Sequence, residues 1–197
     1  NKLRYCKMPD PADKRVGVWD ETKVREQADV RAEAKRLGKT VHFASIIELC
    51  MEKGSELPKD HPGRKFKGRA VFLGNQVKDE KFDWAEFSEM SSNPPSMEAA
   101  RFCDFLGCLP KYSVKNGDAK SAYTQAYFVG HETWVRLPER HWPKEWEKKY
   151  KCPVCPLVLA LYGHTDSGGI WEEKCDRGLK SIGFEAVAWE WPGVYWH

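Results

Sequence analysis

Apolar residues recur along this chain at two different spacings, and this change of spacing constrains the fold more than any other feature. Helical spacing, near 3.6 residues, predicts helices at 22–37, 96–106 and 166–182. Short runs rich in Val, Phe and Ile predict strands at 41–51, 69–77, 112–114, 133–137 and 154–162. The connections contain many of the 12 Pro and 15 Gly and are too irregular for a repeated strand–helix–strand unit. The sequence therefore predicts an α+β fold.

Two of the predicted helices have an apolar side that we expect to be buried. In the last helix the spacings are four, four and three residues, along Trp171, Cys175, Leu179 and Ile182, before Gly183 ends the helix. In the helix at 96–106 the expected buried side is made of Met97, Ala100 and Cys103, with Phe102 or Leu106. The strands at 41–51 and 69–77 are expected to form a hairpin whose return strand begins with basic residues.

The composition excludes a disordered tail and a membrane-spanning segment. Hydrophobic residues make up 41% and charged residues 31%, and the apolar stretch Val158–Tyr162 is far shorter than the roughly 20 residues of a membrane helix. No charged-then-apolar leader opens the sequence. We therefore expect an intracellular protein, in cytoplasm or nucleus, with seven reduced cysteines. Because the first residue is Asn1, we also expect a piece of a longer reading frame.

A basic run from Lys59 to Arg69 contains five bases and one acid, with Phe66 among them. Such a cluster on a hairpin could bind phosphates. The alternative is an ordinary solvated loop, which charge patterning alone favours. The net charge of +3 does not decide between them, because phosphate binding depends on where the charges lie.

A zinc site is a second possibility. Cys152 and Cys155 have the spacing of half a structural site, and His164 and Cys175 follow as candidate ligands. Only one close pair is present, and Cys175 lies on the apolar stripe of its predicted helix. The sequence therefore favours ordinary buried thiols over zinc ligands.

The segment Asn116–Ala126 has the most specific pattern for chemistry. Asp118 is followed by small residues and then by Tyr123, in the order Asp-Ala-Lys-Ser-Ala-Tyr. A carboxylate can bind a cation, and small residues let backbone N–H groups approach a triphosphate. From spacing alone, an Asp that caps a turn is the simpler reading.

Several blocks in collinear order, over about residues 40 to 197, resemble the reverse transcriptase domain of copia-type long-terminal-repeat retrotransposons. The segment 65–74 resembles the family's basic-then-apolar fingers strand, and 118–123 resembles its Asp-Val-Lys-Ser-Ala-Phe block. Further similar blocks lie at 134–138, 153–171, 179–184 and 194–195. The resemblance implies an RNA-directed DNA polymerase with the fingers and the first half of the palm of a right-hand polymerase.

The resemblance divides the chain into an N-terminal linker and helix at 1–38, a fingers-like hairpin region at 39–95, and a partial palm at 96–197. It implies template–primer and deoxynucleotides as partners, with further domains of a Pol-type polyprotein. It also implies roles for single residues, in which Asp118 and the Ala119 carbonyl hold two Mg²⁺ ions. The residues expected to bind the nucleotide are Lys65, Lys67, Arg69, Ser121, Ala122 and Tyr123, of which Tyr123 would lie under the sugar and exclude ribonucleotides.

The sequence departs from the family in its carboxylates and in one amide. No Asp-Asp pair occurs, although the family uses two further aspartates, and Asp166 replaces the usual Gln. We therefore expect a chain truncated before the second catalytic motif, which is inactive alone and prone to aggregate. The alternative is a catalytically dead remnant that binds nucleic acid through its basic hairpin.

Overall fold

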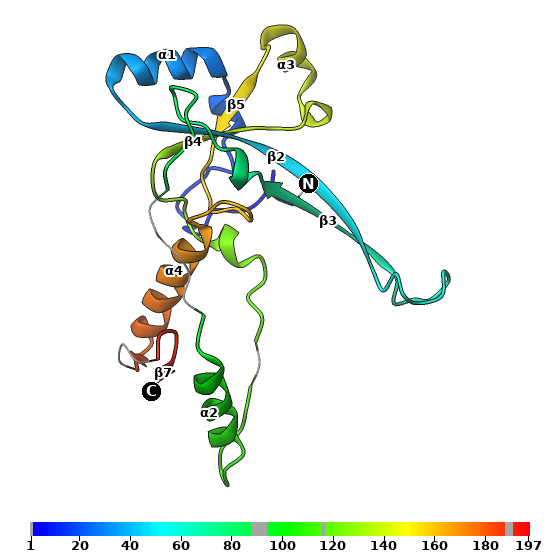
Figure 1. The fold of residues 1–197 in the computed structure, drawn as a ribbon, viewed down its shortest axis with the longest axis vertical. Coiled ribbons are helices and arrows are strands. Elements are labelled where there is room, and N and C mark those ends of the chain that lie inside the picture. The colour runs from blue at the N-terminus through cyan, green and yellow to red at the C-terminus, as the bar shows by residue number, and fades with distance from the viewer. Residues whose placement is uncertain (1, 88–93, 116, 188–190) are drawn as a thin grey trace.

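A five-stranded mixed sheet organises the chain (Figure 1). The computed structural model describes residues 2–87, 94–115, 117–187 and 191–197. The sheet has the order β1-β5-β4-β2-β3, from β1 (Arg25–Glu26), β2 (Val41–Lys53), β3 (Lys65–Phe72), β4 (Glu132–Arg136) and β5 (Pro153–Pro156). β2 and β4 run parallel, and the other neighbouring strands are antiparallel. A separate two-stranded ribbon pairs β6 (Glu185–Ala186) with β7 (Tyr195–Trp196).

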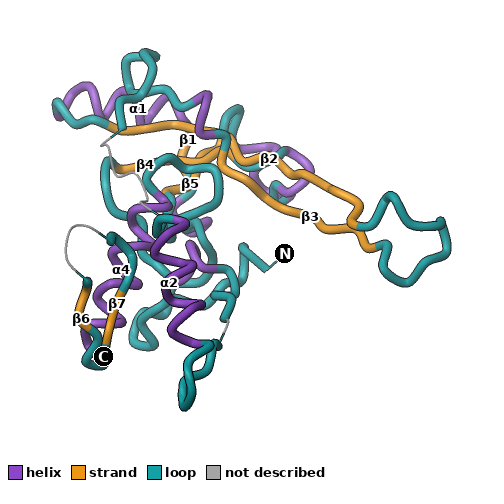
Figure 2. Tube along the Cα trace, turned by 60° about the horizontal axis from the view of Figure 1, so that its bottom comes forward, coloured by secondary structure: helices purple, strands orange, loops and turns teal. Residues whose placement is uncertain are grey.

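The described residues form four α-helices. They are α1 (Gln27–Leu37), α2 (Met97–Gly107), α3 (Lys144–Lys149) and α4 (Ser167–Ser181). Figure 2 shows α1 beside the sheet and α2 and α4 extending away from it. Short 3₁₀ helices occur at Glu21–Lys23, Gly74–Gln76, Ala122–Gln125 and Glu139–His141. In Figure 1, α1 and α3 lie on one side of the sheet, and α2 and α4 extend on the other.

Strand alternation assigns the core residues to the two faces of the sheet. On one face Val41, Phe43 and Trp134 pack with residues of α1. On the other face Ala44 and Val135 belong to the larger core, which also contains core residues from the N-terminal segment and from 157–161. The centre of the sheet is therefore covered on both faces.

The outer halves of β2 and β3 leave this core and form a two-stranded arm. The strands pair in continuous register from Ile46 with Phe72 to Lys53 with Lys65. Most residues of the arm are exposed, and Figure 1 shows the arm projecting from the body. Since β3 lies at the edge of the sheet, the arm contacts the body only at its base.

Most predicted elements are confirmed, with shifted ends. The hairpin is present, but its return strand begins at Lys65, so the basic residues lie within β3. α1 begins at Gln27 because Arg25 and Glu26 pair with β5. Ser96 caps α2 by accepting a hydrogen bond from the Ala99 N–H. β5 is four residues long, and the chain then continues through isolated bridges.

Three predictions are wrong. Residues 112–114 form no strand, because no other strand pairs with them. The expected buried side of α2 is exposed, since Met97 is 64% exposed and Ala99 is the buried residue of this helix. On α4, Cys175 and Ile182 are exposed, so the stripe that includes them is not a core face. Periodicity identified both helices, but it does not show which surface another element covers.

A search of the described ranges finds no helix that combines the length and the apolar character needed to span a bilayer.

Candidate nucleic-acid interface

The two faces of the arm differ in charge. Because side chains alternate along a strand, the register places Lys53, Lys65, Lys67 and Arg69 on one face, together with Leu49 and Met51. We call this the basic face. The opposite face carries Glu48, Glu52, Cys50 and Phe66. The three basic residues predicted from the sequence therefore share one exposed face, and Lys53 joins them across the strand pair.

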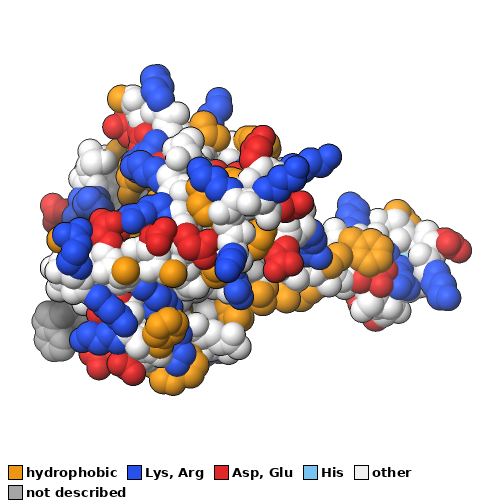
Figure 3. Space-filling view, turned by 90° about the horizontal axis from the view of Figure 1, so that it is seen from above, with side chains coloured by type: hydrophobic (Ala, Val, Ile, Leu, Met, Phe, Trp, Pro, Cys, Tyr) orange, Lys and Arg blue, Asp and Glu red, His pale blue; other side chains and the backbone are white. Residues whose placement is uncertain are grey.

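The tip of the arm uses another basic residue for structure. Arg64 Nε donates to Glu52 Oε1 at 2.8 Å, and its Nη1 donates to the Leu57 carbonyl at 2.9 Å. These bonds hold the loop between β2 and β3 closed. Arg64 therefore stabilises the hairpin, while the cations of the basic face are exposed to solvent. Figure 3 shows basic, acidic and apolar side chains together on the projecting arm.

At the base of the arm, the turn that contains Gly163 lies in close contact with the backbone of β3. The Phe72 N–H donates to the Tyr162 carbonyl at 2.8 Å. Gly163 has φ of +94°, and a Cβ at this position would lie 2.0 Å from the Phe72 oxygen and 2.7 Å from Val71 Cγ1. Since Val71 is on the same side of β3 as Arg69, the turn lies at the inner end of the basic face.

Tyr123 reaches the same place from another part of the chain. Its ring lies 4.4 Å, between centroids, from the ring of Tyr162, at an interplanar angle of 50°. Tyr123 also packs against a small core of Ala126, Ala160 and Ile170. The structure thus brings the predicted sugar-contacting residue to the inner end of the basic face, through a residue that is 39 positions away in the sequence.

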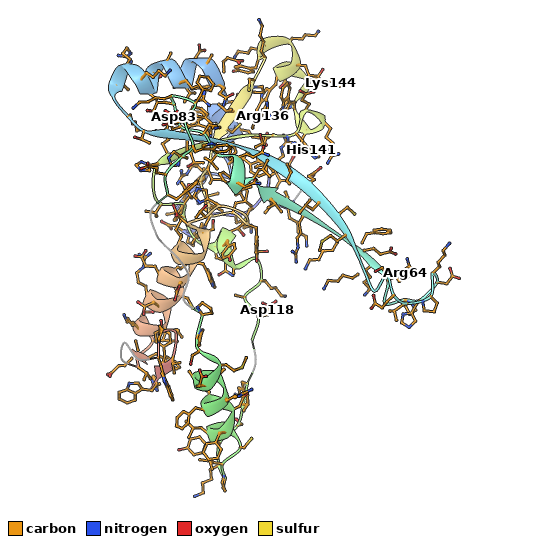
Figure 4. The ribbon with its side chains drawn as sticks, in the orientation of Figure 1. Arg64, Asp83, Asp118, Arg136, His141 and Lys144 are labelled. Carbon is orange, nitrogen blue, oxygen red and sulfur yellow. The ribbon has the colours of Figure 1, made fainter. Side chains whose placement is uncertain are left out.

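The residues before Tyr123 form an exposed approach to this place. Ser121 has φ of +54° and precedes the 3₁₀ helix Ala122–Gln125, whose first residue is half-buried. Asp118 and Ala119 are exposed in the preceding loop, and Asn116 of the same segment is outside the described residues. Figure 4 shows Asp118 between the arm and α2. Asp118 is therefore open to solvent, and among the described residues it belongs to no group of three or more metal-binding side chains.

Behind this surface, the turn that carries Tyr162 is held by a buried histidine. His164 is 5% exposed and lies against the rings of Phe72, Phe87 and Phe128, with centroids 4.7–5.3 Å away. Its Nδ1 accepts a hydrogen bond from the Asp166 N–H at 3.1 Å. Burial lowers the pKa of His164 to about 4, with a smaller contribution from His42. The imidazole is therefore neutral at pH 7.

Asp166, which replaces the family's usual Gln, is itself 5% exposed and directly precedes α4. Its backbone N–H, as described above, binds His164. The side chain of Asp166 is therefore buried and does not lie on the exposed surface.

The zinc candidates do not form a cluster in the described part of the chain, where no group of three metal-binding side chains occurs. Cys152 Sγ contacts Gln27 Oε1 at 3.1 Å. Burial raises the pKa of the Cys155 thiol far above its usual value, which disfavours the thiolate that zinc requires. Cys175 is exposed on α4.

Sequence reasoning missed three contributors to the site. Lys53 lies outside the basic run of β3 and joins the basic face only through its register with Lys65. Tyr162 and Gly163 lie in the segment 153–171, far from the basic run in the sequence. The signal for them was the Leu-Tyr-Gly sequence itself, since a glycine after an apolar strand indicates a close backbone approach.

Comparison of the chain with protein-family models, with curated proteins and with solved structures gives no match.

Proposed function

We propose that this chain is part of a reverse transcriptase of the copia type, an intracellular RNA-directed DNA polymerase that forms part of a Pol-type polyprotein. One observation carries the proposal. The turn that follows Tyr162, the ring partner of Tyr123, lies beside Val71, which is on the same side of β3 as Arg69, so the segment that resembles the catalytic block comes to the base of the arm that carries the cations. A template–primer and a deoxynucleotide triphosphate both require such a combination of cations and aromatic rings.

In this proposal the chain's residues bind and orient the substrates. Lys65, Lys67 and Arg69 hold phosphates from the arm, and Lys53 adds a fourth cation. The backbone N–H groups of Ser121 and Ala122 approach the triphosphate. The ring of Tyr123 lies under the sugar, where it leaves no room for a 2′-hydroxyl.

The Asp118 carboxylate and the Ala119 carbonyl are oxygen donors of the kind that Mg²⁺ prefers. When bound, two such ions lower the barrier to an in-line displacement by stabilising the attacking and leaving oxygens. One carboxylate does not make a two-ion site, and the described residues hold no larger group around Asp118. The chain alone is therefore not expected to polymerise.

A second candidate is a catalytically dead remnant that binds nucleic acid through the arm. It requires only the exposed cations of the arm and no metal-binding group at Asp118. Both candidates require binding at the basic face, and only the first requires Asp118. Binding and chemistry therefore need separate tests.

Binding is tested by the fluorescence anisotropy of a labelled RNA template–DNA primer, measured over a range of salt concentrations. Lys65→Ala combined with Lys67→Ala removes two phosphate contacts, so the slope of log K against log salt should fall by about 2. The matched control removes Lys144 and Lys148, which are exposed at α3. Equal losses in both double variants would refute binding at the basic face.

Chemistry is tested in the chain joined to a palm segment that bears aromatic-x-Asp-Asp. Asp118→Asn should abolish primer extension and leave template–primer affinity nearly unchanged. Tyr123→Ala should permit incorporation of ribonucleotides. Retained extension by the Asp118 variant would exclude the catalytic role, and absence of extension in the unmutated joined chain would favour the remnant.

A further inference from the structure

A groove of about 760 Å³ lies beside the base of the arm. Its walls come from three parts of the chain, namely residues 2–4, the bases of β2 and β3, and residues 137–141. Ile46, Glu48 and Ala70 line it from the face opposite the basic face, and Leu49 and Arg69 line it from the basic face. Figure 4 shows His141 of this groove near α3 and Asp118 well away from it. The groove therefore adjoins the basic face, but Asp118, Tyr123 and Tyr162 are not among the residues that line it.

The groove combines an apolar floor with a cationic rim. Trp19, Ile46 and Leu137 line it and are buried core residues, 3–7% exposed. Its charged side chains are four bases, Lys2, Arg4, Arg69 and Arg140, against the single carboxylate of Glu48. Arg69, on the edge strand β3, borders both the groove and the basic face. The volume is typical of a site for a small organic molecule, and the excess of bases favours an anion.

The cations of the rim are held in place before any ligand arrives. Glu48 forms an ion pair with Arg140, and its Oε1 lies within hydrogen-bond distance of His141 Nε2, at 2.8 Å. Arg4 forms an ion pair with Glu21 and donates from Nη2 to the His141 carbonyl at 2.8 Å. A guanidinium has five N–H donors, so each arginine can bind its carboxylate and a phosphate together. Fixed donors reduce the entropy cost of binding.

We propose that this groove binds an organic phosphate, with the phosphate on the arginine rim and an apolar ring on the floor. Two sources share this chemistry, a free nucleoside monophosphate and the 5′-phosphate end of a nucleic acid. The inference goes beyond the proposed polymerase function and does not depend on it, because Asp118, Tyr123 and Tyr162 do not line the groove.

The test is calorimetric titration of the full chain with AMP at low salt, together with NMR of the His141 ring. AMP should bind and shift the His141 signals, and adenosine should do neither. Arg140→Gln should weaken AMP binding about tenfold or more, because it removes a charged hydrogen bond. Arg177→Gln on α4 is the matched control, since its side chain is 70% exposed and ion-paired with Glu173, and that of Arg140 is 66% exposed.

Oligonucleotides with and without a 5′-phosphate distinguish the two sources. Phosphate-dependent binding of the oligonucleotide with a shift at His141, in the absence of AMP binding, would assign the site to nucleic-acid ends. The proposal is overturned if no phosphate shifts His141, if adenosine binds as well as AMP, or if Arg140→Gln and Arg177→Gln have equal effects. Failure here leaves template–primer affinity unaffected, so it can be told apart from failure of the proposed function.

Discussion

Replacement of Gly163 by Ala should loosen the junction between the arm and the turn that carries Tyr162. The positive φ of +94° costs about 1–2 kcal/mol for a residue with a side chain. A Cβ at 2.0 Å from the Phe72 oxygen also forces the backbones apart, and loss of the Phe72–Tyr162 hydrogen bond adds about 1 kcal/mol. The expected loss of unfolding free energy is therefore about 2–3 kcal/mol, or roughly 4–12 °C in Tm.

The assay is urea unfolding followed by tryptophan fluorescence, with Gly178→Ala as the control. Gly178 lies in α4, and no atom lies within 4 Å of a Cβ at this position. The control should therefore gain about 0.5–1 kcal/mol, because Ala is the better helix former. If Gly163→Ala were as stable as the unmutated chain, the close contact of the Gly163 turn with β3 would be refuted. The argument that Tyr123 lies near the basic face would then fail as well.

Three further predictions concern other parts of the chain. The pKa of His164 is about 4, below its unfolded value of 6.5, so the stability that the neutral imidazole confers is complete above pH 6.5 and is lost as the pH falls to 4. The free energy of unfolding, measured against pH, should therefore fall by about 3 kcal/mol over this range. An equal pH dependence in His164→Gln would contradict this prediction. Phe105, 60% exposed on α2, should promote aggregation, so Phe105→Ser should lower light scattering without loss of Tm, and unchanged scattering would exclude this patch. A maleimide should label exposed Cys50 in the native chain and Cys155 only after unfolding, and rapid native labelling of Cys155 would contradict its burial.

The sequence predicted the arm and the main helices because their signals are local. The run of Val, Phe and Ile marks β2, and α1 ends at Leu37 as predicted, where Gly38 adopts φ of +60°. The start of β3 was misplaced because Lys and Gly have little tendency to form strands, and only the register with β2 recruits Lys65 and Lys67 into the sheet.

Longer-range features could not be predicted from local patterns. The pairing of Arg25 and Glu26 with β5 shortens α1, and it depends on residues more than 120 positions away. The same holds for the contact of Tyr123 with Tyr162. Helical periodicity on α2 and α4 identified amphipathic helices without showing that these sides are exposed.

Photo-cross-linking tests most directly whether nucleic acid binds at the basic face, because different aromatic side chains lie near the two faces of the arm. A template–primer containing 5-iododeoxyuridine is irradiated with the full chain, and the attached peptides are identified by mass spectrometry. Aromatic side chains react, and Tyr123 and Tyr162 lie at the inner end of the basic face, while the 77%-exposed Phe66 lies on the opposite face. The account predicts cross-links at Tyr123 or Tyr162, reduced by Lys65→Ala with Lys67→Ala. Cross-links at Phe66 with none at either tyrosine would contradict it.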